Sequence, residues 1–249
     1  VSRNTAATVG LGAYWIFQRD PKATLLVLPA DHWIGNRKKF KEAIRLSIRN
    51  SESTQSFSIV GTKPTFPSSG YGYLQSGQKV SGSVYQLKRF VEKPSPKRAR
   101  AFLRTGTFFW HAGIFAAPAL VILKSFSKYA PSIAGTLSRF AVRGGRVSPR
   151  RLFYALPDIS VDFAILEKLK NAHLVRSGFG WCDVGTWKSF ETLWPKDKLR
   201  NSFFGKCIAS DSCRNVVYAR TKPVYLKGVD DLVVVDTPEA IFISRKDSK

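Results

Sequence analysis

The amino-acid sequence predicts an α/β protein in which a mixed or mostly parallel sheet carries helices on both faces, followed by a small all-β appendage. Two observations predict this class. Up to about residue 200, short apolar strand patterns alternate with amphipathic helix patterns. From Asn201 the strand patterns shorten, helical periodicity ends, and turn pairs such as Lys227-Gly228 recur. We therefore expect a core over residues 1–200 and a small β-rich region over residues 201–249.

The N-terminal half of the core contains clear boundaries between these elements. Asp20-Pro21 ends the first helical pattern, because the residue before a proline avoids the α region. Phe40, Ile44 and Ile48 recur every four positions, as they would on one face of a helix. The patterns predict a helix over 6–19, a strand over 24–28, a helix over 37–49, a strand over 56–60, a loop over 63–72 and a strand over 84–91.

The second half of the core continues the alternation. Ser95-Pro96 is a helix start, with a capping side chain and a proline at the first helical position. Ser160 caps a helix that has Val161, Ile165 and Leu169 on one face. We predict helices over 97–104, 118–128 and 186–194 and strands over 108–115 and 174–176, with an unassigned stretch over 134–152 that Gly144-Gly145 breaks.

The composition limits the possible functions. The net charge of +23, from 40 Lys and Arg against 17 Asp and Glu, attracts polyanions in general. The basic clusters are short and carry neither interleaved aromatic residues nor a recognition motif, so nucleic-acid binding is the weaker alternative. No apolar run is long enough to span a bilayer, and we expect no membrane partner. The three cysteines lack metal-site spacing and indicate a reduced, cytoplasmic protein.

Two acidic residues stand out in a chain that has few of them. Asp183 lies in the turn segment Gly180–Trp187, which contains two tryptophans and two glycines. Asp31 follows the apolar run Leu25–Leu28, which has the pattern of a buried strand. Two carboxylates that meet in one cleft would provide the hard oxygen ligands of Mg²⁺. The alternatives are that Asp31 caps the helix or the turn after its strand and that Asp183 is a turn acid held by backbone amides.

Several polar or glycine-containing segments follow predicted strands in the same way. In open α/β sheets, ligands bind beyond the C-terminal ends of strands. The topology therefore favours one crevice that collects Asp31, the 70–73 loop, Glu92-Lys93, Trp110-His111 and Asp183. Taken alone, Glu92 and Lys93 could equally form an exposed ion pair of little energetic value.

The order of these segments resembles a known family. The chain contains Arg3–Ala6, Leu28–His32, Gly70–Tyr73, Phe90–Pro94, Phe109–Phe115, Ser160–Asp162 and Gly180–Trp187 in that order, and Gly228–Thr237 near its end. This series resembles mannose-1-phosphate guanylyltransferases, which are sugar nucleotidyltransferases, and it covers nearly the whole chain. The resemblance implies a Rossmann-like nucleotidyltransferase that joins GTP and mannose 1-phosphate into GDP-mannose and releases pyrophosphate.

The resemblance also implies roles for single residues. Asp31 and Asp183 would hold Mg²⁺ against the phosphates, and Lys93 would neutralise phosphate charge. In such a reaction the sugar phosphate oxygen attacks the α-phosphorus in line, and the protein mainly positions the groups and neutralises charge.

The sugar side would involve four other positions. The backbone of Gly72 would lie against the sugar, and Glu92 would accept hydrogen bonds from its hydroxyls. Asp162 is a further candidate, although it could order only the neighbouring loop. His111 stands where the family usually has Asn, which leaves both that contact and the identity of the sugar open.

A second departure concerns the beginning of the chain. The family opens with a strand and a Gly-rich loop that holds the triphosphate, and this sequence contains no such loop. We therefore keep a non-catalytic sugar-nucleotide-binding protein, or a transferase for another sugar 1-phosphate, as alternatives. We further expect a homodimer, but the sequence alone fixes neither the nucleotide base nor the oligomeric state.

Overall fold

In the computed structural model the chain divides into two compact units. The structure describes residues 4–142, 153–185 and 187–248. The larger unit comprises Val1–Pro29 and Gly35–Gly180, and the smaller unit comprises Ala30–Ile34 and Trp181–Lys249. The domain boundary that we predicted at residue 200 stays a prediction.

A mixed sheet forms the centre of the larger unit. Its strand order is β1-β6-β3-β7-β5-β4, and β4 also pairs with β6. β3 and β7 are parallel, whereas the pairings of β6 with β1 and β3, and those of β5 with β4 and β7, are antiparallel. The strands are β1 (Thr24–Val27), β3 (Phe57–Thr62), β4 (Tyr73–Ser81), β5 (Val84–Val91), β6 (Phe108–Pro118) and β7 (Ala172–Ser177).

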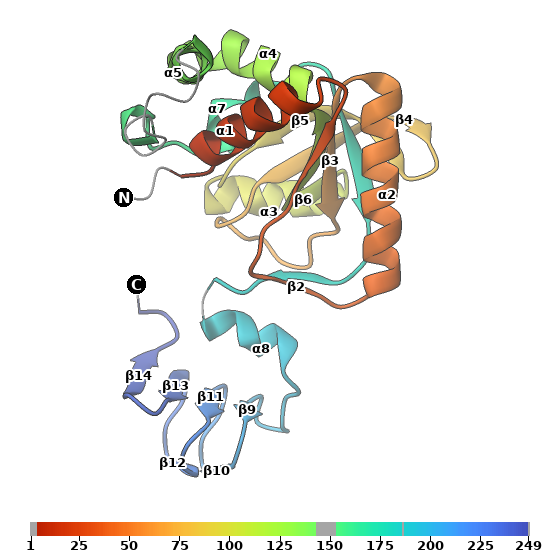
Figure 1. Ribbon diagram of the computed structural model, residues 1–249. Coiled ribbons are helices and arrows are strands. Elements are labelled where there is room, and N and C mark those ends of the chain that lie inside the picture. Colours follow the sequence, from red (N-terminus) through yellow and green to blue (C-terminus); the bar gives the residue numbers. More distant parts are fainter. Residues whose placement is uncertain (1–3, 143–152, 186, 249) are drawn as a thin grey trace. The chain divides into compact units, whose positions relative to one another are not determined.

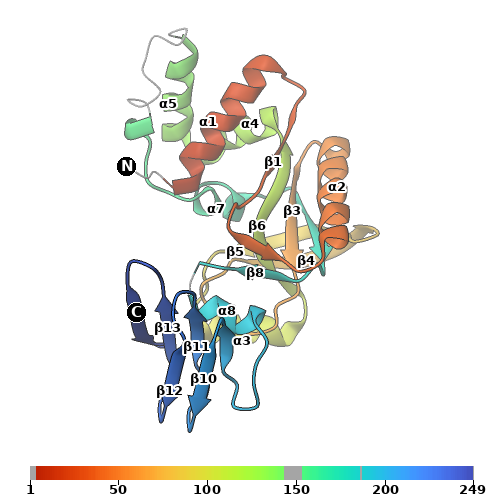
Figure 2. The same cartoon turned by 60° about the horizontal axis from the view of Figure 1, so that its bottom comes forward.

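Helices cover both faces of this sheet, as the sequence predicts. In both ribbon views α2 lies on one side of β3 and β6, and α1 and α4 lie on the other (Figures 1 and 2). Asn36 caps α2 by accepting a hydrogen bond from the backbone N–H of Lys39. The helices are α1 (Asn4–Arg19), α2 (Arg37–Thr54), α3 (Pro96–Thr105), α4 (Ala119–Tyr129), α5 (Pro131–Val142), α7 (Val161–Ala164) and the 3₁₀ helix η1 (Leu166–Lys168).

One hydrophobic core joins the sheet to α1, α4 and α5. Phe57 and Phe115 face each other from β3 and β6 with ring centroids 5.9 Å apart, and both are fully buried. Phe126 of α4 and Leu137 of α5 belong to the same cluster. Gly10 of α1 lies so close to them that a Cβ atom there would be 2.9 Å from Leu137. This packing fixes the sheet whose strand ends carry the candidate site residues.

The structure differs from the sequence-based prediction at two places in this unit. β4 was not predicted, because its sequence, with Gln75, Ser76 and Lys79, lacks the apolar alternation of a strand; its pairing with β5 and β6 defines it. The helix after Ser160 is one turn long and continues as η1 rather than extending to Leu169. The predicted break at Gly144 and Gly145, and the motif residues Arg3 and Thr186, lie outside the described residues.

The smaller unit is a stack of short strands, which confirms the predicted all-β appendage. β9 (Ser202–Phe204), β11 (Val216–Ala219) and β13 (Leu232–Asp236) are parallel neighbours, and β10 (Cys207–Ser210) pairs in parallel with β12 (Val224–Lys227). β14 (Ile241–Arg245) turns back and pairs antiparallel with β13. The predicted helix over 186–194 is a 3₁₀ turn, Trp187–Ser189, followed by α8 (Phe190–Leu193).

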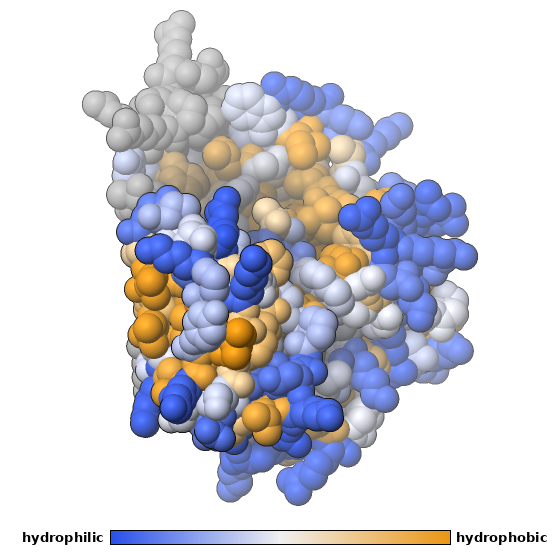
Figure 3. Space-filling view, turned by 90° about the horizontal axis from the view of Figure 1, so that it is seen from below, coloured by the Kyte–Doolittle hydropathy of each residue, from blue (hydrophilic) through white to orange (hydrophobic). Residues whose placement is uncertain are grey.

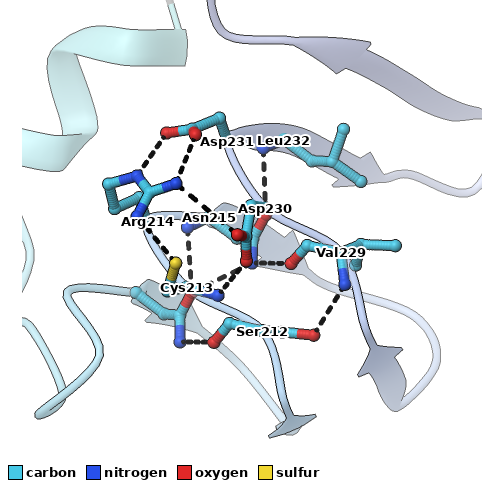
Figure 4. Close-up of polar contacts among 9 residues, drawn as sticks. Ser212, Cys213, Arg214, Asn215, Val229, Asp230, Asp231 and Leu232 are labelled. Atoms are coloured by element: carbon cyan, nitrogen blue, oxygen red, sulfur yellow. Dashed lines mark hydrogen bonds and ion pairs between the residues drawn. The ribbon is translucent and has the colours of Figure 1, made fainter.

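Buried polar side chains link successive coils of this stack (Figure 4). Asn215 is fully buried, and its amide group donates to Asn201 and to the carbonyl of Val229. Its oxygen accepts from the backbone N–H of Leu232. The stack therefore depends on side-chain hydrogen bonds as well as on its small apolar core.

Some large apolar side chains remain exposed, and Figure 3 shows apolar patches between hydrophilic ones. On β14, Ile241, Phe242 and Ile243 all have more than half of their surface exposed, and Tyr225 of β12 is similarly exposed. No helix within the described ranges has both the length and the apolar character needed to cross a membrane.

Candidate active site

The smaller unit brings Asp31 and Asp183 to one imidazole ring. β2 (His32–Ile34) and β8 (Trp181–Asp183) form an antiparallel pair in which His32 stands opposite Asp183. The Nε2 atom of His32 lies 3.9 Å from Oδ1 of Asp31 and 3.9 Å from Oδ1 of Asp183. The two carboxylate oxygens are therefore no farther apart than the sum of these two distances, although 151 other residues separate them in the chain.

Trp181 fixes the orientation of that ring. Its indole Nε1–H donates a hydrogen bond of 3.0 Å to Nδ1 of His32, and the two rings meet edge to face. Since Nδ1 accepts this bond, the imidazole proton is on Nε2, which faces both carboxylates. Sequence reasoning did not assign any role to His32, although its position directly after Asp31 could have suggested one.

The environments of the two carboxylates bear on the alternatives raised above. Asp31 is 77% exposed and does not cap α2, because Asn36 does so. Asp183 accepts a hydrogen bond of 2.9 Å from the backbone N–H of Gly185, as a turn acid would. A carboxylate can accept about four hydrogen bonds, so this contact orients Asp183 and leaves it able to bind a cation.

This donor set fits a divalent cation that is shared with a substrate. Two carboxylates from distant segments supply hard oxygen ligands, which Mg²⁺ prefers. Among the described residues there is no group of three or more His, Cys, Asp and Glu side chains arranged to hold a metal ion. Substrate phosphates and water would therefore have to complete the coordination, as is usual for Mg²⁺ in phosphoryl transfer sites.

The larger unit brings together the residues proposed for the sugar side. The backbone N–H of His111 donates to the carbonyl of Gly72 over 2.8 Å. A Cβ atom at Gly72 would lie 2.5 Å from Oε2 of Glu92 and 2.5 Å from the ring of Phe90, so only glycine fits there. The Nε2 atom of His111 lies 3.2 Å from Oδ1 of Asp162. A glycine, two carboxylates and an imidazole thus form one cluster.

Four different elements position these side chains. Glu92 directly follows β5, and its backbone N–H donates to the carboxylate of Glu167 in η1 over 2.6 Å. His111 lies within β6, and Asp162 is in the first turn of α7, which the side chain of Ser160 caps. The early end of α7 at Ala164 and the start of η1 place Glu167, a residue that sequence reasoning missed and for which the sequence offers no signal.

The two carboxylates of this cluster have opposite pKa shifts. Burial and the nearby charge of Asp162 raise the pKa of Glu92 from its ordinary value of 4.5 to about 7, against the smaller opposing effects of His111 and Lys93. Burial alone would also raise the pKa of Asp162, but its hydrogen bond and charge interaction with His111, with further hydrogen bonds, bring that pKa below its ordinary value. Divergent pKa values of neighbouring acids are typical of functional sites.

Lys93 has an unusual backbone. Its φ angle is +43°, in the left-handed region that residues with a Cβ rarely adopt. Its side chain is 60% exposed, and the ammonium group lies 4.0 Å from the carboxylate of Glu92. A contact of that length at the surface contributes little to stability, so it does not explain the strained backbone.

Comparison with known proteins identifies the family. Residues 1–198 match the family model described as Nucleotidyl transferase. The chain belongs to the nucleotidyl transferase family. Residues 205–249 of this family member match the model of the MannoseP isomerase/GMP-like beta-helix domain, which agrees with the stacked strands of the smaller unit.

Several relatives of this nucleotidyl transferase have names. The chain is 33% identical to the mannose-1-phosphate guanylyltransferase of Sinorhizobium fredii, over 98% of its own length and 49% of the relative's. It is 33% identical to a mannose-1-phosphate guanylyltransferase of Escherichia coli, over 99% of its own length and 54% of the relative's. The chain thus spans about half the length of these curated relatives.

A solved structure extends this similarity to the fold. A crystal structure from Thermus thermophilus, titled mannose-1-phosphate geranyltransferase, superimposes with a TM-score of 0.89 at 32% identity. The match covers 99% of this chain and 72% of that one. The predicted Rossmann-like nucleotidyltransferase fold is therefore confirmed.

Proposed function

We propose that the protein transfers GMP from GTP to mannose 1-phosphate, giving GDP-mannose and pyrophosphate. The observation that carries the proposal is the convergence of Asp31 and Asp183 on one imidazole in a chain of this family. The names of the relatives at 33% identity support the choice of guanine nucleotide and mannose.

The two carboxylates would hold a divalent cation, which we take to be Mg²⁺. When bound, the cation supplies positive charge to the phosphate oxygens as the phosphate bond is exchanged. The exposure of Asp31 supports direct contact with a bound nucleotide. His32 keeps the carboxylates in place through its contacts with both, while Trp181 holds the ring.

The residues of the larger unit would bind and position the sugar phosphate. Gly72 lets the sugar approach the backbone, since any side chain there would collide with Glu92. Glu92 and Asp162 accept hydrogen bonds from sugar hydroxyls, and Lys93 offers an exposed ammonium group to a phosphate. The acceptor oxygen of the sugar phosphate is already ionised, so its attack on the α-phosphorus requires no general base.

The decisive experiment measures pyrophosphate release from GTP and mannose 1-phosphate in the presence of Mg²⁺. We expect turnover that falls about 100-fold in Asp183→Asn, because one of two charged ligands is lost. Asp158→Asn is a matched control, since Asp158 is an exposed carboxylate outside the site. Equal turnover of the Asp183→Asn variant and the wild type would refute the proposed role.

Two alternatives can be separated with the same material. If GDP-mannose binds in a Mg²⁺-dependent way but pyrophosphate is not released, the protein is a non-catalytic sugar-nucleotide-binding protein. The imidazole of His111 in the sugar cluster favours testing a second acceptor, so mannose 1-phosphate and glucose 1-phosphate should be compared. A higher kcat/KM for glucose 1-phosphate would replace mannose in the proposal.

We also propose that the protein forms a homodimer and works in a reducing compartment. The exposed apolar strand β14 supports self-association, and Cys182, Cys207 and Cys213 are all free thiols. Sedimentation at several concentrations tests the first point: an Ile243→Ser variant should dissociate at higher concentration than the wild type. A monomer at all concentrations would contradict the homodimer.

A further inference from the structure

The side chain of His111 is buried and contacts Asp162, and within the described part of the chain one of its nitrogens has no hydrogen-bond partner. Its side chain is only 6% exposed, and Nε2 contacts Asp162 at 3.2 Å. Among the described residues, the buried Nδ1 atom has no hydrogen-bond partner. A buried polar atom without a partner costs about 1–3 kcal/mol, which a ligand or water could recover.

The contact with Asp162 has a definite polarity. An ionised carboxylate only accepts hydrogen bonds, so Nε2 of His111 carries a proton and donates a hydrogen bond to Asp162. The ring is also held by Phe90, whose centroid lies 5.1 Å away in an edge-to-face contact. Asp162 is thereby kept as a fixed, negatively charged acceptor beside Glu92.

The surroundings of Glu92 leave it as the group that can change its protonation state. Asp162 of α7 and Glu167 of η1 are negative charges that disfavour its ionised form. His111 of β6 and Lys93 act in the opposite direction and favour the ionised form. Glu92 is only 9% exposed, so water does little to screen these charges.

We propose that His111 is a positioning residue that keeps Asp162 ionised and thereby makes Glu92 the proton-exchanging group of the sugar side, so that binding of a sugar nucleotide releases a proton from Glu92. The inference rests on the proposed function, because it assumes that a sugar hydroxyl donates a hydrogen bond to Glu92. An ionised carboxylate accepts this hydrogen bond more strongly than the neutral acid does, so binding favours the ionised form of Glu92. The proton that leaves Glu92 passes to the solvent.

The first test needs no ligand. The chemical shift of the carboxyl carbon of Glu92 is measured by NMR as a function of pH. The Glu92→Gln variant identifies which signal belongs to Glu92. His111→Asn removes a group that favours the ionised form of Glu92 and should raise the pH midpoint of its titration, whereas Asp162→Asn removes a negative charge and should lower that midpoint, each by roughly half a pH unit or more. His173→Asn is the control, since His173 lies on β7 and contacts Ser56 instead.

Shifts of the Glu92 midpoint in opposite directions for the His111 and Asp162 variants distinguish this role from a merely structural one. If His111 and Asp162 only held the loop in place, either substitution would admit water to Glu92, and both would lower its midpoint. Shifts in the same direction, or none, overturn the proposal. Should His111→Asn fail to fold, His111→Gln takes its place.

The second test measures proton release on binding. Calorimetry with GDP-mannose and Mg²⁺ in two buffers of different ionisation enthalpy gives the number of protons exchanged. GDP-mannose is preferred to mannose 1-phosphate, because a phosphate monoester itself titrates near pH 6. We expect binding to release a fraction of a proton near pH 7 and the affinity for GDP-mannose to rise as pH increases through 7. The Glu92→Gln variant should release no proton.

The outcomes separate this inference from the proposed function. Binding of GDP-mannose without proton release, or with equal release in Glu92→Gln, overturns the linkage and leaves the proposed function standing. Absence of binding at every pH overturns the proposed function, and the linkage falls with it.

Discussion

His32 stands directly opposite Asp183 across the β2–β8 pair, with Nε2 3.9 Å from Oδ1 of the carboxylate. The residue before it in the chain, Asp31, reaches the same nitrogen. The strand pairing thus brings two carboxylates to His32: that of Asp31, its neighbour in sequence, and that of Asp183, which is distant in the chain. Neither carboxylate would meet the other without this antiparallel pair.

We expect Asp31→Asn to weaken Mg²⁺-dependent binding of GDP-mannose by about 10- to 100-fold, because a neutral amide is a poorer ligand for the cation. Since Asp31 is largely exposed, its replacement should change the free energy of unfolding by less than about 0.5 kcal/mol. Titration calorimetry with and without Mg²⁺, together with urea unfolding, checks both statements. An equal loss of affinity in the absence of Mg²⁺ would show that the residue acts by another route.

Lys93 allows backbone strain to be separated from charge. Lys93→Gly and Lys93→Ala both remove the ammonium group, but only glycine adopts a φ of +43° without penalty. The glycine variant should be about 1 kcal/mol more stable than the alanine variant, and both should bind mannose 1-phosphate more weakly than the wild type. Chemical unfolding and calorimetric titration with mannose 1-phosphate supply the measurements. If the two variants are equally stable, the backbone at this position is not strained.

Burial of Glu92 makes stability depend on pH. The pKa of Glu92 rises from 4.5 to about 7 on folding, so between these values the folded state binds more protons than the unfolded state. The free energy of unfolding should therefore fall as pH rises from 4.5 to 7, by at most roughly 3 kcal/mol from this group.

Urea unfolding of the wild type and Glu92→Gln at pH 5 and pH 8 measures that effect. The glutamine variant should lose less stability than the wild type between the two values. Glu42→Gln is the control, because Glu42 is exposed on α2. Parallel pH profiles for the wild type and Glu92→Gln would contradict the raised pKa of Glu92.

Asn215 should be essential for the smaller unit. Asn215→Ala removes its three side-chain hydrogen bonds to Asn201, Val229 and Leu232 and leaves buried groups unpaired, so we expect a loss of about 2–4 kcal/mol. Tryptophan fluorescence during urea unfolding can follow this unit, since Trp187 and Trp194 lie near Tyr218. Asn171→Ala, at an exposed position, is the control. A loss no larger than in that control would show that the hydrogen bonds are dispensable.

The sequence was informative where a local rule applies. The caps at Ser95 and Ser160 and the stop at Asp20-Pro21 predicted where helices begin and end. By contrast, β4 has no apolar alternation and takes its conformation from its partners, β5 and β6. The short strands β2 and β8 were missed for the same reason, because their hydrogen bonds are made across the chain.

By itself the sequence determined the α/β class, the β-rich tail and the identity of seven candidate site residues, because strand and helix periodicities and the order of motifs are local properties of the chain. Only the tertiary structure decided that His32 joins Asp31 to Asp183 and that His111 separates the charge states of Glu92 and Asp162. The physical reason is that pKa values and ion pairs depend on burial and on distances of 3–4 Å between atoms of distant segments, which no local pattern encodes.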